Sequence, residues 1–359
     1  MCLIPFVYLC KVMEKGQKRD LRKLSTDELT EFFESVGERK FRSKQVKEWL
    51  WKKSAIDINE MSNLSAQTRE KLKDSFCINN ISLDHAQNSE DGTVKSAFRL
   101  HDGHLIEGVL IPTKKRMTAC ISSQVGCSLS CKFCATGFLE RKRNLDAAEI
   151  YDQVVMINKQ ALDHYQKRLT NIVYMGMGEP MLNYAEVLKS AEYITSPEGL
   201  HMSSQRITVS TAGVAKMIRK LGDDMAKFNL AVSLHAADEE KRNQIMPINE
   251  TNSLESLKGA LQYYYDKTGN DVTFEYILFY NFNDSLKDAD NLLKFSRVVP
   301  SKVNIIEYNP ISESSFTNTD PQTLEKFRDY LTRKGVNVRV RRSRGKDIDA
   351  ACGQLANKN

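Results

Sequence analysis

Short apolar runs alternate with longer amphipathic segments from about residue 116 to residue 345 of the chain. Each run is rich in residues that favour β-structure, which predicts a buried strand, and the longer segments carry apolar positions at helical spacing. Strands and helices that alternate in this way form a parallel sheet, either open or closed into a barrel. The predicted strands cover residues 117–122, 171–176, 206–211, 229–234, 272–278, 302–308 and 336–341.

Residues 26–77 show only the helical pattern. Three helices are predicted, and Leu29 and Phe33 fall on one face of the first, with Ser25 or Thr26 as its N-cap. Lys and Arg are frequent at the outer positions of this module. They form either an ordinary solvated surface or a face that contacts nucleic acid.

Residues 93–112 alternate with period two around an Asp102-Gly103 turn, which predicts a β-hairpin. The pattern therefore predicts an α/β domain preceded by a small helical domain and a hairpin linker. The expected boundaries are 1–20 for a disordered or spurious leader, 21–90 for the helical domain, 91–112 for the hairpin, 113–345 for the α/β domain and 346–359 for a C-terminal segment.

The composition is that of a soluble globular protein, with 41% hydrophobic and 27% charged residues. A net charge of +6 permits a polyanionic partner without requiring one. No apolar run reaches the roughly 18 residues that a membrane span needs, so we expect no membrane association. The apolar stretch 1–10 has neither a basic region before it nor a small-residue cleavage site, so we expect no signal peptide, and either Met1 or Met13 is the true start.

The stretch "CISSQVGCSLSCKFCATG", which begins at Cys120, contains four of the eight cysteines. Cys127, Cys131 and Cys134 follow a C-x3-C-x2-C spacing and are too close together to close useful disulfide loops, so metal-binding or reactive thiols in a reducing compartment are expected. Three thiolates can hold a four-iron cluster and leave one iron open. A structural zinc site would need a fourth ligand, either Cys120 or His235.

Unusual polar segments follow most of the predicted strands. They are the cysteine loop, "GMGEP" at 176–180, "STAG" at 210–213, "SLHA" at 233–236 and "YNP" at 308–310. In parallel α/β folds, the loops at the carboxyl edge of the sheet build the active site. These segments are therefore predicted to meet at one site.

The cysteine spacing, with Phe133 just before the third cysteine, resembles the signature of the radical S-adenosylmethionine (SAM) superfamily. The resemblance implies a partial TIM-like (β/α)6 barrel and one [4Fe-4S] cluster held by Cys127, Cys131 and Cys134. The open iron would bind the amino and carboxylate groups of SAM. "GMGEP" is similar to the superfamily element that takes the amino group, and Gly178 and Glu179 are the matching positions.

"YMGMGEPMLN", "VSLHA", "MPIN" and "DIDAACGQL" further resemble the dual-specificity RNA methyltransferases of this superfamily. That resemblance implies methylation of adenosine carbon 2 in 23S rRNA and tRNA by a cytoplasmic, monomeric enzyme with a flavodoxin-type electron donor. A related group methylates carbon 8 instead and lacks the proline that stands here as Pro180. The resemblance also implies further contacts to SAM from Ser210, Ser233, Leu234, His235 and Asn309.

The same resemblance assigns roles to three residues that are unremarkable in isolation. Cys352 would receive a methyl group from one SAM, and a radical derived from a second SAM would activate that methyl group for addition to adenine. Cys120 would then attack the sulfur of Cys352, which releases the RNA and forms a transient disulfide. Glu107 would be the proton acceptor. Read alone, Cys352 is a small apolar filler and Glu107 a solvated strand carboxylate.

Basic residues are concentrated at 113–118, 140–144 and 339–347, on either side of the predicted site. We expect them to contact RNA phosphates, which position a substrate without specifying its sequence. A non-catalytic iron–sulfur or zinc RNA-binding protein is the alternative. Such a protein would need neither Cys120 nor Cys352, which favours the enzyme.

Overall fold

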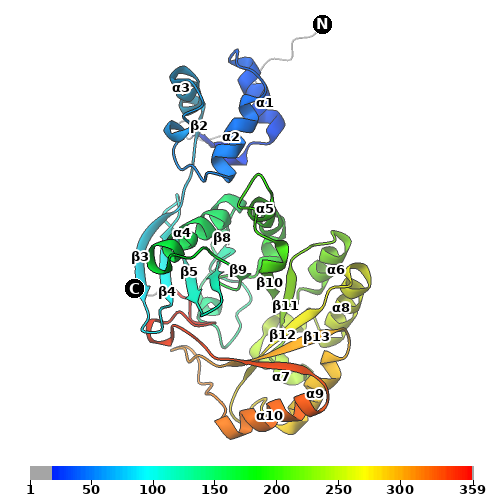
Figure 1. Ribbon diagram of the computed structural model, residues 1–359. Coiled ribbons are helices and arrows are strands. Elements are labelled where there is room, and N and C mark those ends of the chain that lie inside the picture. Colours follow the sequence, from blue (N-terminus) through cyan, green and yellow to red (C-terminus); the bar gives the residue numbers. More distant parts are fainter. Residues whose placement is uncertain (1–17, 358–359) are drawn as a thin grey trace. The chain divides into compact units, whose positions relative to one another are not determined.

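The structure is a computed structural model that describes residues 18–357 (Figure 1). The two alternatives for the true start, Met1 and Met13, therefore lie outside the described residues. The chain divides into two compact units, the first through Asn80 and the second from Ile81, apart from residues 198–200. None of the described helices combines the length and the apolar character needed to cross a membrane.

The first unit is the predicted helical module. Ser25 caps α1 in a capping box with Glu28, and Leu29 and Phe33 are buried, as their spacing predicts. Residues 19 and 20 were wrongly assigned to a leader, because they form a short parallel strand against the end of the module. Its elements are β1 (Arg19–Asp20), α1 (Thr26–Ser35), α2 (Arg42–Trp51), α3 (Ala66–Ser75) and β2 (Phe76–Cys77).

The second unit begins with three antiparallel strands, β3 (Ser82–Asn88), β4 (Val94–Arg99) and β5 (Leu105–Pro112). The antiparallel pair of β4 and β5 confirms the hairpin predicted over residues 93–112. The predicted domain boundary at residue 90 differs from the division after Asn80, because β3 pairs with β4 along its length and so belongs to the second unit.

Seven parallel strands then continue the same sheet in the described part of the chain. Strand β6 pairs with both β5 and β9, and the order across the sheet is β14-β13-β12-β11-β10-β9-β6-β5-β4-β3. The parallel strands are β6 (Met117–Cys120), β9 (Asn171–Tyr174), β10 (Ile207–Thr211), β11 (Asn229–Ser233), β12 (Val272–Leu278), β13 (Ser301–Glu307) and β14 (Asn337–Arg341). All seven predicted strands are thus present.

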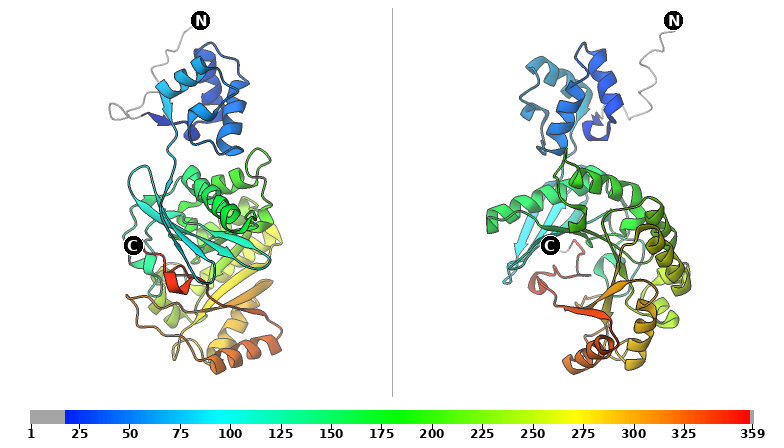
Figure 2. Two further views of the ribbon diagram at one scale, coloured as in Figure 1. Left: turned by 60° about the vertical axis from the view of Figure 1, so that its left-hand side comes forward. Right: turned by 45° about the vertical axis from the view of Figure 1, so that its right-hand side comes forward.

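Helices connect successive parallel strands and lie on the outer side of the curved sheet (Figure 2). They are α4 (Ala147–Tyr165), α5 (Tyr184–Thr195), α6 (Ala215–Asp223), α7 (Glu239–Ile245), α8 (Leu254–Thr268), α9 (Leu286–Ser296) and α10 (Pro321–Arg333). Asp146 caps α4 in a capping box with Glu149, as predicted. The sheet keeps two edges, β14 and β3, so the partial barrel implied by the resemblance is confirmed.

The C-terminal segment that follows β14 turns back along the inner side of the curved sheet (Figure 2). Two short strands, β7 (Gln124–Val125) and β8 (Arg143–Asn144), pair on either side of the cysteine loop. Helices cover the outer face of the parallel strands, so the carboxyl edge and the inner face are left to form the site.

Candidate active site

A cavity of about 420 Å³ opens at the carboxyl edge of the parallel strands. The strand-end segments that the sequence singled out meet here. Ten of the predicted site residues line it, namely Cys120, Cys127, Cys131, Cys134, Gly178, Glu179, Ser210, Ser233, His235 and Cys352. Glu107, Leu234 and Asn309 are not among its lining residues.

The three cysteines of the loop lie close enough together to influence one another. Burial raises the pKa of Cys127 to about 11, and it also raises the pKa values of Cys131 and Cys134 above their usual range. The neighbouring thiol of Cys134 raises the pKa values of the other two further. Cationic irons would favour the thiolate forms that this environment otherwise disfavours.

Glu179 is fully enclosed at the wall of the same cavity, 3% exposed. Its carboxylate accepts hydrogen bonds from the backbone N–H groups of Ala212 at 2.7 Å and Met181 at 3.0 Å. Burial nevertheless raises its pKa to about 7. A cationic partner such as an ammonium group would favour the ionised form of this carboxylate. Among the described residues, no cationic side chain is hydrogen-bonded to it, so it can accept such a group from the cavity.

Gly178 holds the turn before this carboxylate in a left-handed conformation, with φ of +92°. A Cβ atom there would lie 2.4 Å from the Gln124 side chain. The amide of Gln124 in turn accepts the N–H of Glu179 at 2.8 Å. The glycine is therefore needed for the close approach that fixes Glu179.

His235 is buried and packs edge-on against Phe133, with the ring centroids 4.7 Å apart. Burial, with a smaller contribution from Arg242, lowers its pKa to about 3, so the ring is neutral. Its Nδ1 accepts the N–H of Ile277 at 3.2 Å, which places the proton of the neutral ring on Nε2. Together with Ser210 and Ser233, it contributes uncharged polar groups to the wall.

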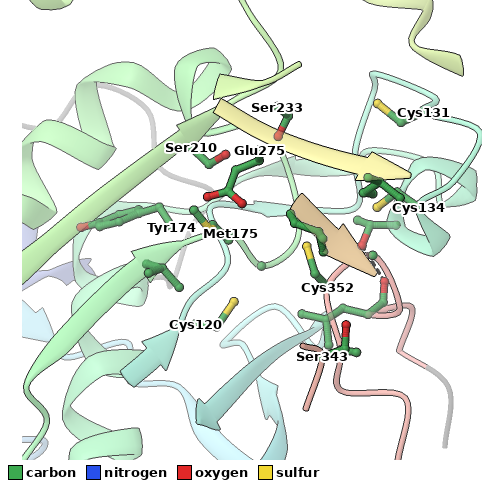
Figure 3. A pocket seen from close by; sticks show the side chains of 18 of the residues that line it. Cys120, Cys131, Cys134, Tyr174, Met175, Ser210, Ser233, Glu275, Ser343 and Cys352 are labelled. Carbon is green, nitrogen blue, oxygen red and sulfur yellow. Dashed lines mark hydrogen bonds between the residues drawn. The ribbon is translucent and has the colours of Figure 1, made fainter. Parts of the chain in front are cut away.

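Cys120 and Cys352 come from opposite ends of the second unit and face the same space (Figure 3). Cys120 ends β6 and is buried, whereas Cys352 is exposed to the cavity. Burial raises the pKa of Cys120 to about 12 and that of Cys352 to about 11, and Arg341 counteracts both shifts. Two thiols thus share one cavity with the cysteine triad.

Comparison with known proteins agrees with this arrangement. Residues 121–293 match the radical SAM superfamily, and residues 19–78 match the ribosomal RNA large subunit methyltransferase N-terminal domain. A Cytophaga hutchinsonii protein named "Probable dual-specificity RNA methyltransferase RlmN" is 58% identical, over 98% of this chain and 97% of its own. The chain belongs to the RlmN family. A Staphylococcus saprophyticus protein of the same name is 40% identical, over 97% of this chain and 95% of its own.

Among solved structures, a radical SAM methyltransferase from Sphaerobacter thermophilus superposes with a TM-score of 0.89 at 36% identity, covering 95% of this chain and all of that one. The chain is thus an enzyme of the radical SAM RNA methyltransferase family. Membership implies a [4Fe-4S] cluster and SAM.

The donor set fits the cluster that membership in the RlmN family implies. Within residues 18–357, no three His, Cys, Asp or Glu side chains converge on a point that would hold a single metal ion. The thiolates of a cluster bind different irons and need not converge, whereas the ligands of a tetrahedral zinc must. Cys127, Cys131 and Cys134 would hold the cluster, and Glu179 would face the amino group of SAM.

Two glycines that flank the triad serve the loop itself. A Cβ atom at Gly126 would lie 2.2 Å from the carbonyl oxygen of Glu140, and one at Gly137 would lie 2.7 Å from that of Cys131. The glycines are required because the loop packs tightly against its own backbone.

Arg242 is a residue of this site that sequence analysis missed. It is fully buried on α7 and donates to the backbone carbonyls of Ala212 at 2.7 Å, Leu234 at 3.1 Å and Ser233 at 3.4 Å. The guanidinium therefore ties the end of β10 to the end of β11. Asn249, the last residue of "MPIN", also accepts from it. The only available signal was a charged residue just before that motif.

Replacement of Arg242 by methionine should destabilise the protein by about 3–5 kcal/mol, because buried carbonyls from two strand ends lose their donor. The shift in the urea midpoint, with an unchanged slope, measures this effect. Arg219→Met is the matched control, since Arg219 is exposed on α6 and stacks on Tyr263. Equal midpoints for the two variants would contradict the assigned role of Arg242.

Glu275 is a second residue that the sequence analysis missed. It lines the cavity at 4% exposure (Figure 3). Its carboxylate accepts from Asn304 at 2.8 Å and from Arg341 at 3.2 Å. A carboxylate inside the apolar run "VTFEYIL" was the signal for it. Arg341, which we assigned to RNA phosphate, is therefore held inside the site by an ion pair.

Leu234 and Asn309, which do not line the cavity, are hydrogen-bonded to backbone carbonyls of residues that do. Leu234 is buried and donates its N–H to the carbonyl of Glu275 at 3.0 Å. Asn309 donates from its side chain to the carbonyl of Cys352 at 3.0 Å, and its own buried side-chain oxygen has no hydrogen-bond partner. Asn309 is thus positioned to support the Cys352 loop.

Proposed function

We propose that this enzyme methylates carbon 2 of adenosine in 23S rRNA and in tRNA, through an S-methylcysteine at Cys352 and a transient disulfide with Cys120. The observation that supports it best is that both thiols line one cavity with the cysteine triad and Glu179. A protein that only binds RNA would have no use for two further thiols beside a cluster.

Methylation of Cys352 requires its thiolate, because the thiolate is the nucleophile in displacement at the SAM methyl group. Partial exclusion of water by the walls of the cavity raises the pKa of this thiol, although its side chain remains accessible from the cavity, and Arg341 opposes that effect. The exposure of Cys352 to the cavity gives a methyl donor access to its sulfur. The cluster and SAM, when bound, supply the radical chemistry that an electron-poor adenine carbon needs.

Cys120 is the group that resolves the covalent protein–RNA intermediate. Its thiolate attacks the sulfur of Cys352, so that a sulfur–sulfur bond forms as the bond from Cys352 to the transferred carbon breaks. The electron pair of that bond stays with the carbon, which takes up a proton and becomes the methyl group. Arg341 favours the thiolate of Cys120 as well. An external reductant then restores both thiols. We assign electron delivery to a flavodoxin-type donor, and we place the enzyme in the cytoplasm as a monomer.

RNA phosphates are the proposed partners of the basic residues around the cavity. Arg116, Arg342 and Arg344 line it, and Arg342 is 86% exposed at its side chain. In the segment 140–144, Arg143 is bound by Asp102 and by Glu149 at 2.7 Å. In the stretch 339–347, Arg342 pairs with Glu307 only at 3.5 Å and remains exposed, so we assign the phosphate contact next to Cys352 to Arg342.

Replacement of Arg342 by glutamate should weaken RNA binding and lower the slope of log affinity against log salt concentration by about one, as loss of one phosphate contact does. Filter binding across a salt series measures that slope. Arg333→Glu, an exposed change at the end of α10, is the control. A salt slope equal to that of the wild type would contradict the phosphate contact.

The deciding experiment uses anaerobically reconstituted protein with a 23S rRNA fragment or tRNA, reductant and SAM, followed by RNA digestion and mass spectrometry. We expect 2-methyladenosine. Detection of 8-methyladenosine would move the target to the other carbon. Cleavage of SAM with unmodified RNA would contradict the substrate, and zinc without iron or sulfide would favour a non-catalytic RNA-binding protein.

A further inference from the structure

Two amide side chains close the neck of the cysteine loop. Gln124 lies on β7 shortly before Cys127, and Asn144 lies on β8 beyond the last cysteine of the triad. The two strands pair with Gln124 opposite Asn144. The side-chain N–H of Gln124 donates to the side-chain oxygen of Asn144 at 2.8 Å. The pair therefore joins the two ends of the loop that would hold the cluster.

The other end of each amide reaches the turn that carries Glu179. The side-chain oxygen of Gln124 accepts the N–H of Glu179 at 2.8 Å. The side-chain N–H of Asn144 donates to the carbonyl of Leu182 at 3.2 Å. Leu182 in turn donates its backbone N–H to the carbonyl of Glu179 at 3.0 Å, so both amides act on one short turn. The hydrogen bonds thus form a continuous chain from the loop ends to this turn.

The direction of the bonds in this chain fixes how the two amides are oriented. An amide oxygen only accepts, and an amide nitrogen only donates. If Gln124 were reversed, its N–H would face the N–H of Glu179, and its oxygen would face that of Asn144. Gln124 is 0% exposed, so water does not take the place of a lost partner. Only this arrangement of the pair therefore satisfies the chain of bonds.

Other hydrogen bonds hold the same two segments together independently of this pair. The N–H groups of Ser123 and Gln124 donate to the carbonyl of Met177 at 2.9 Å and 3.2 Å. The side chain of Asn183 donates to the carbonyl of Ser123 at 2.8 Å. The segments should thus stay in contact when the Gln124 side chain is changed, and what is lost is the bond to the peptide of Glu179.

The peptide that Gln124 holds determines where the carboxylate of Glu179 lies. Both carboxylate oxygens are fixed by backbone N–H groups, one by Met181 and the other by Ala212. The side chain therefore has little freedom to compensate for a rotated peptide. Because a small misplacement of a binding group is costly, the peptide orientation matters for any cation that the carboxylate receives.

We propose that Gln124 is a positioning residue for SAM. It holds the peptide of Glu179 so that the carboxylate meets the amino group of SAM, and Asn144 keeps Gln124 in that orientation. The inference deepens the proposed function and rests on it for the reaction that SAM serves. Because the same amide pair joins the two ends of the cysteine loop, affinity for SAM depends on closure of that loop.

Three substitutions test the pair. Gln124→Met removes both side-chain hydrogen bonds at a similar side-chain length. Asn144→Leu removes the partner that orients Gln124, whereas Asn144→Asp restores an oxygen that accepts from it. Gln153→Met is the matched control, because Gln153 is also 0% exposed but binds the backbone of Ser122, from which it accepts at 2.8 Å and to which it donates at 3.1 Å.

The first readout is the dissociation constant of SAM, measured by equilibrium dialysis of anaerobic, cluster-loaded protein without reductant or RNA. We expect Gln124→Met to raise it by about 10-fold and Asn144→Leu by about 5-fold, because the buried N–H of Glu179 loses a correctly oriented acceptor. Asn144→Asp and Gln153→Met should stay within about 2-fold of the wild type. The double variant Gln124→Met/Asn144→Leu should match Gln124→Met, since both changes break one chain.

The second readout is a split between the kinetic constants of methyladenosine formation. Gln124→Met should raise the KM for SAM by about 10-fold and leave kcat at saturating SAM within about 2-fold, because only the binding of SAM is weakened. The KM for RNA and the iron and sulfide content should equal those of the wild type. Weaker SAM binding at full cluster content separates a positioning role from simple support of the loop.

Wild-type affinity for SAM in Gln124→Met would overturn the proposal. An equal loss in Gln153→Met would also overturn it, because the effect would then be a general one of buried packing. If Gln124→Met does not take up the cluster, Asn144→Leu, at a half-buried position, decides by the same criteria. If the wild type makes no methyladenosine, the proposed function fails, and SAM affinity measured without RNA still decides the role of Gln124.

Discussion

Replacement of Cys352 by alanine is expected to lower formation of methyladenosine by at least about 10³-fold, since a covalent carrier is removed and not weakened. Cleavage of SAM should continue, because Cys127, Cys131, Cys134 and Glu179 are untouched and line the cavity independently of this thiol. Mass spectrometry of the digested RNA and chromatography of SAM cleavage products measure the two outcomes on the same sample.

The matched control is Cys77→Ala, which removes a half-buried thiol of the first unit. That variant should methylate RNA at the wild-type rate. Methyladenosine formed by Cys352→Ala at a rate near that of the wild type would show that the methyl group reaches RNA without this sulfur. Loss of SAM cleavage as well would mean that Cys352 supports the cluster loop, to which Gly353 is hydrogen-bonded.

Replacement of Cys120 by alanine should produce a different failure, in which a covalent protein–RNA adduct accumulates. The earlier steps need Cys352 and the cluster loop, whereas release needs a second thiol, and turnover should fall by at least about 10³-fold. Denaturing gel electrophoresis with labelled RNA should show up to one RNA per protein. Peptide mass analysis should place the link at Cys352.

The double variant Cys120→Ala/Cys352→Ala is the control for that trap, and it should form no adduct. An adduct that survives in the double variant would place the covalent link elsewhere. Rapid turnover by Cys120→Ala without an adduct would contradict the transient disulfide and would require another group to release the RNA.

Both predictions concern Cys120 and Cys352, two thiols that the cavity keeps mainly in the protonated form. Burial raises the pKa values of Cys120 and Cys352, and Arg341 is the cation that opposes this for each. Arg341 is oriented by Glu275, which is itself fixed by Asn304. The site therefore combines protected thiols with one guanidinium that favours their reactive form.

Much of the fold was predictable from local patterns along the chain. Alternating apolar runs predicted all seven parallel strands, and the capping boxes at Ser25 and Asp146 predicted where two helices begin. These signals are local because strand and helix periodicity, and the pairing of a cap with the residue three positions on, need only neighbouring residues. The cysteine triad could be recognised in the same way, because its three residues lie close together in the sequence.

The polar residues at strand ends were predictable because parallel strands bring their carboxyl ends to one edge. Gly178, Glu179, Ser210, Ser233 and His235 line one cavity accordingly. The domain boundary was misplaced by the sequence because β3 has no strong alternation of its own and is defined by its pairing with β4.

The amino-acid sequence by itself thus determined the α/β class, the placement of the polar motifs after successive strands, and the cysteine triad. Only the tertiary structure decided that Arg242 joins two strand ends, that Glu275 holds Arg341 and that Glu107 binds the backbone near residue 357. The physical reason is that each of these contacts joins distant parts of the chain. Their geometry depends on how whole elements pack, which no local period or spacing specifies.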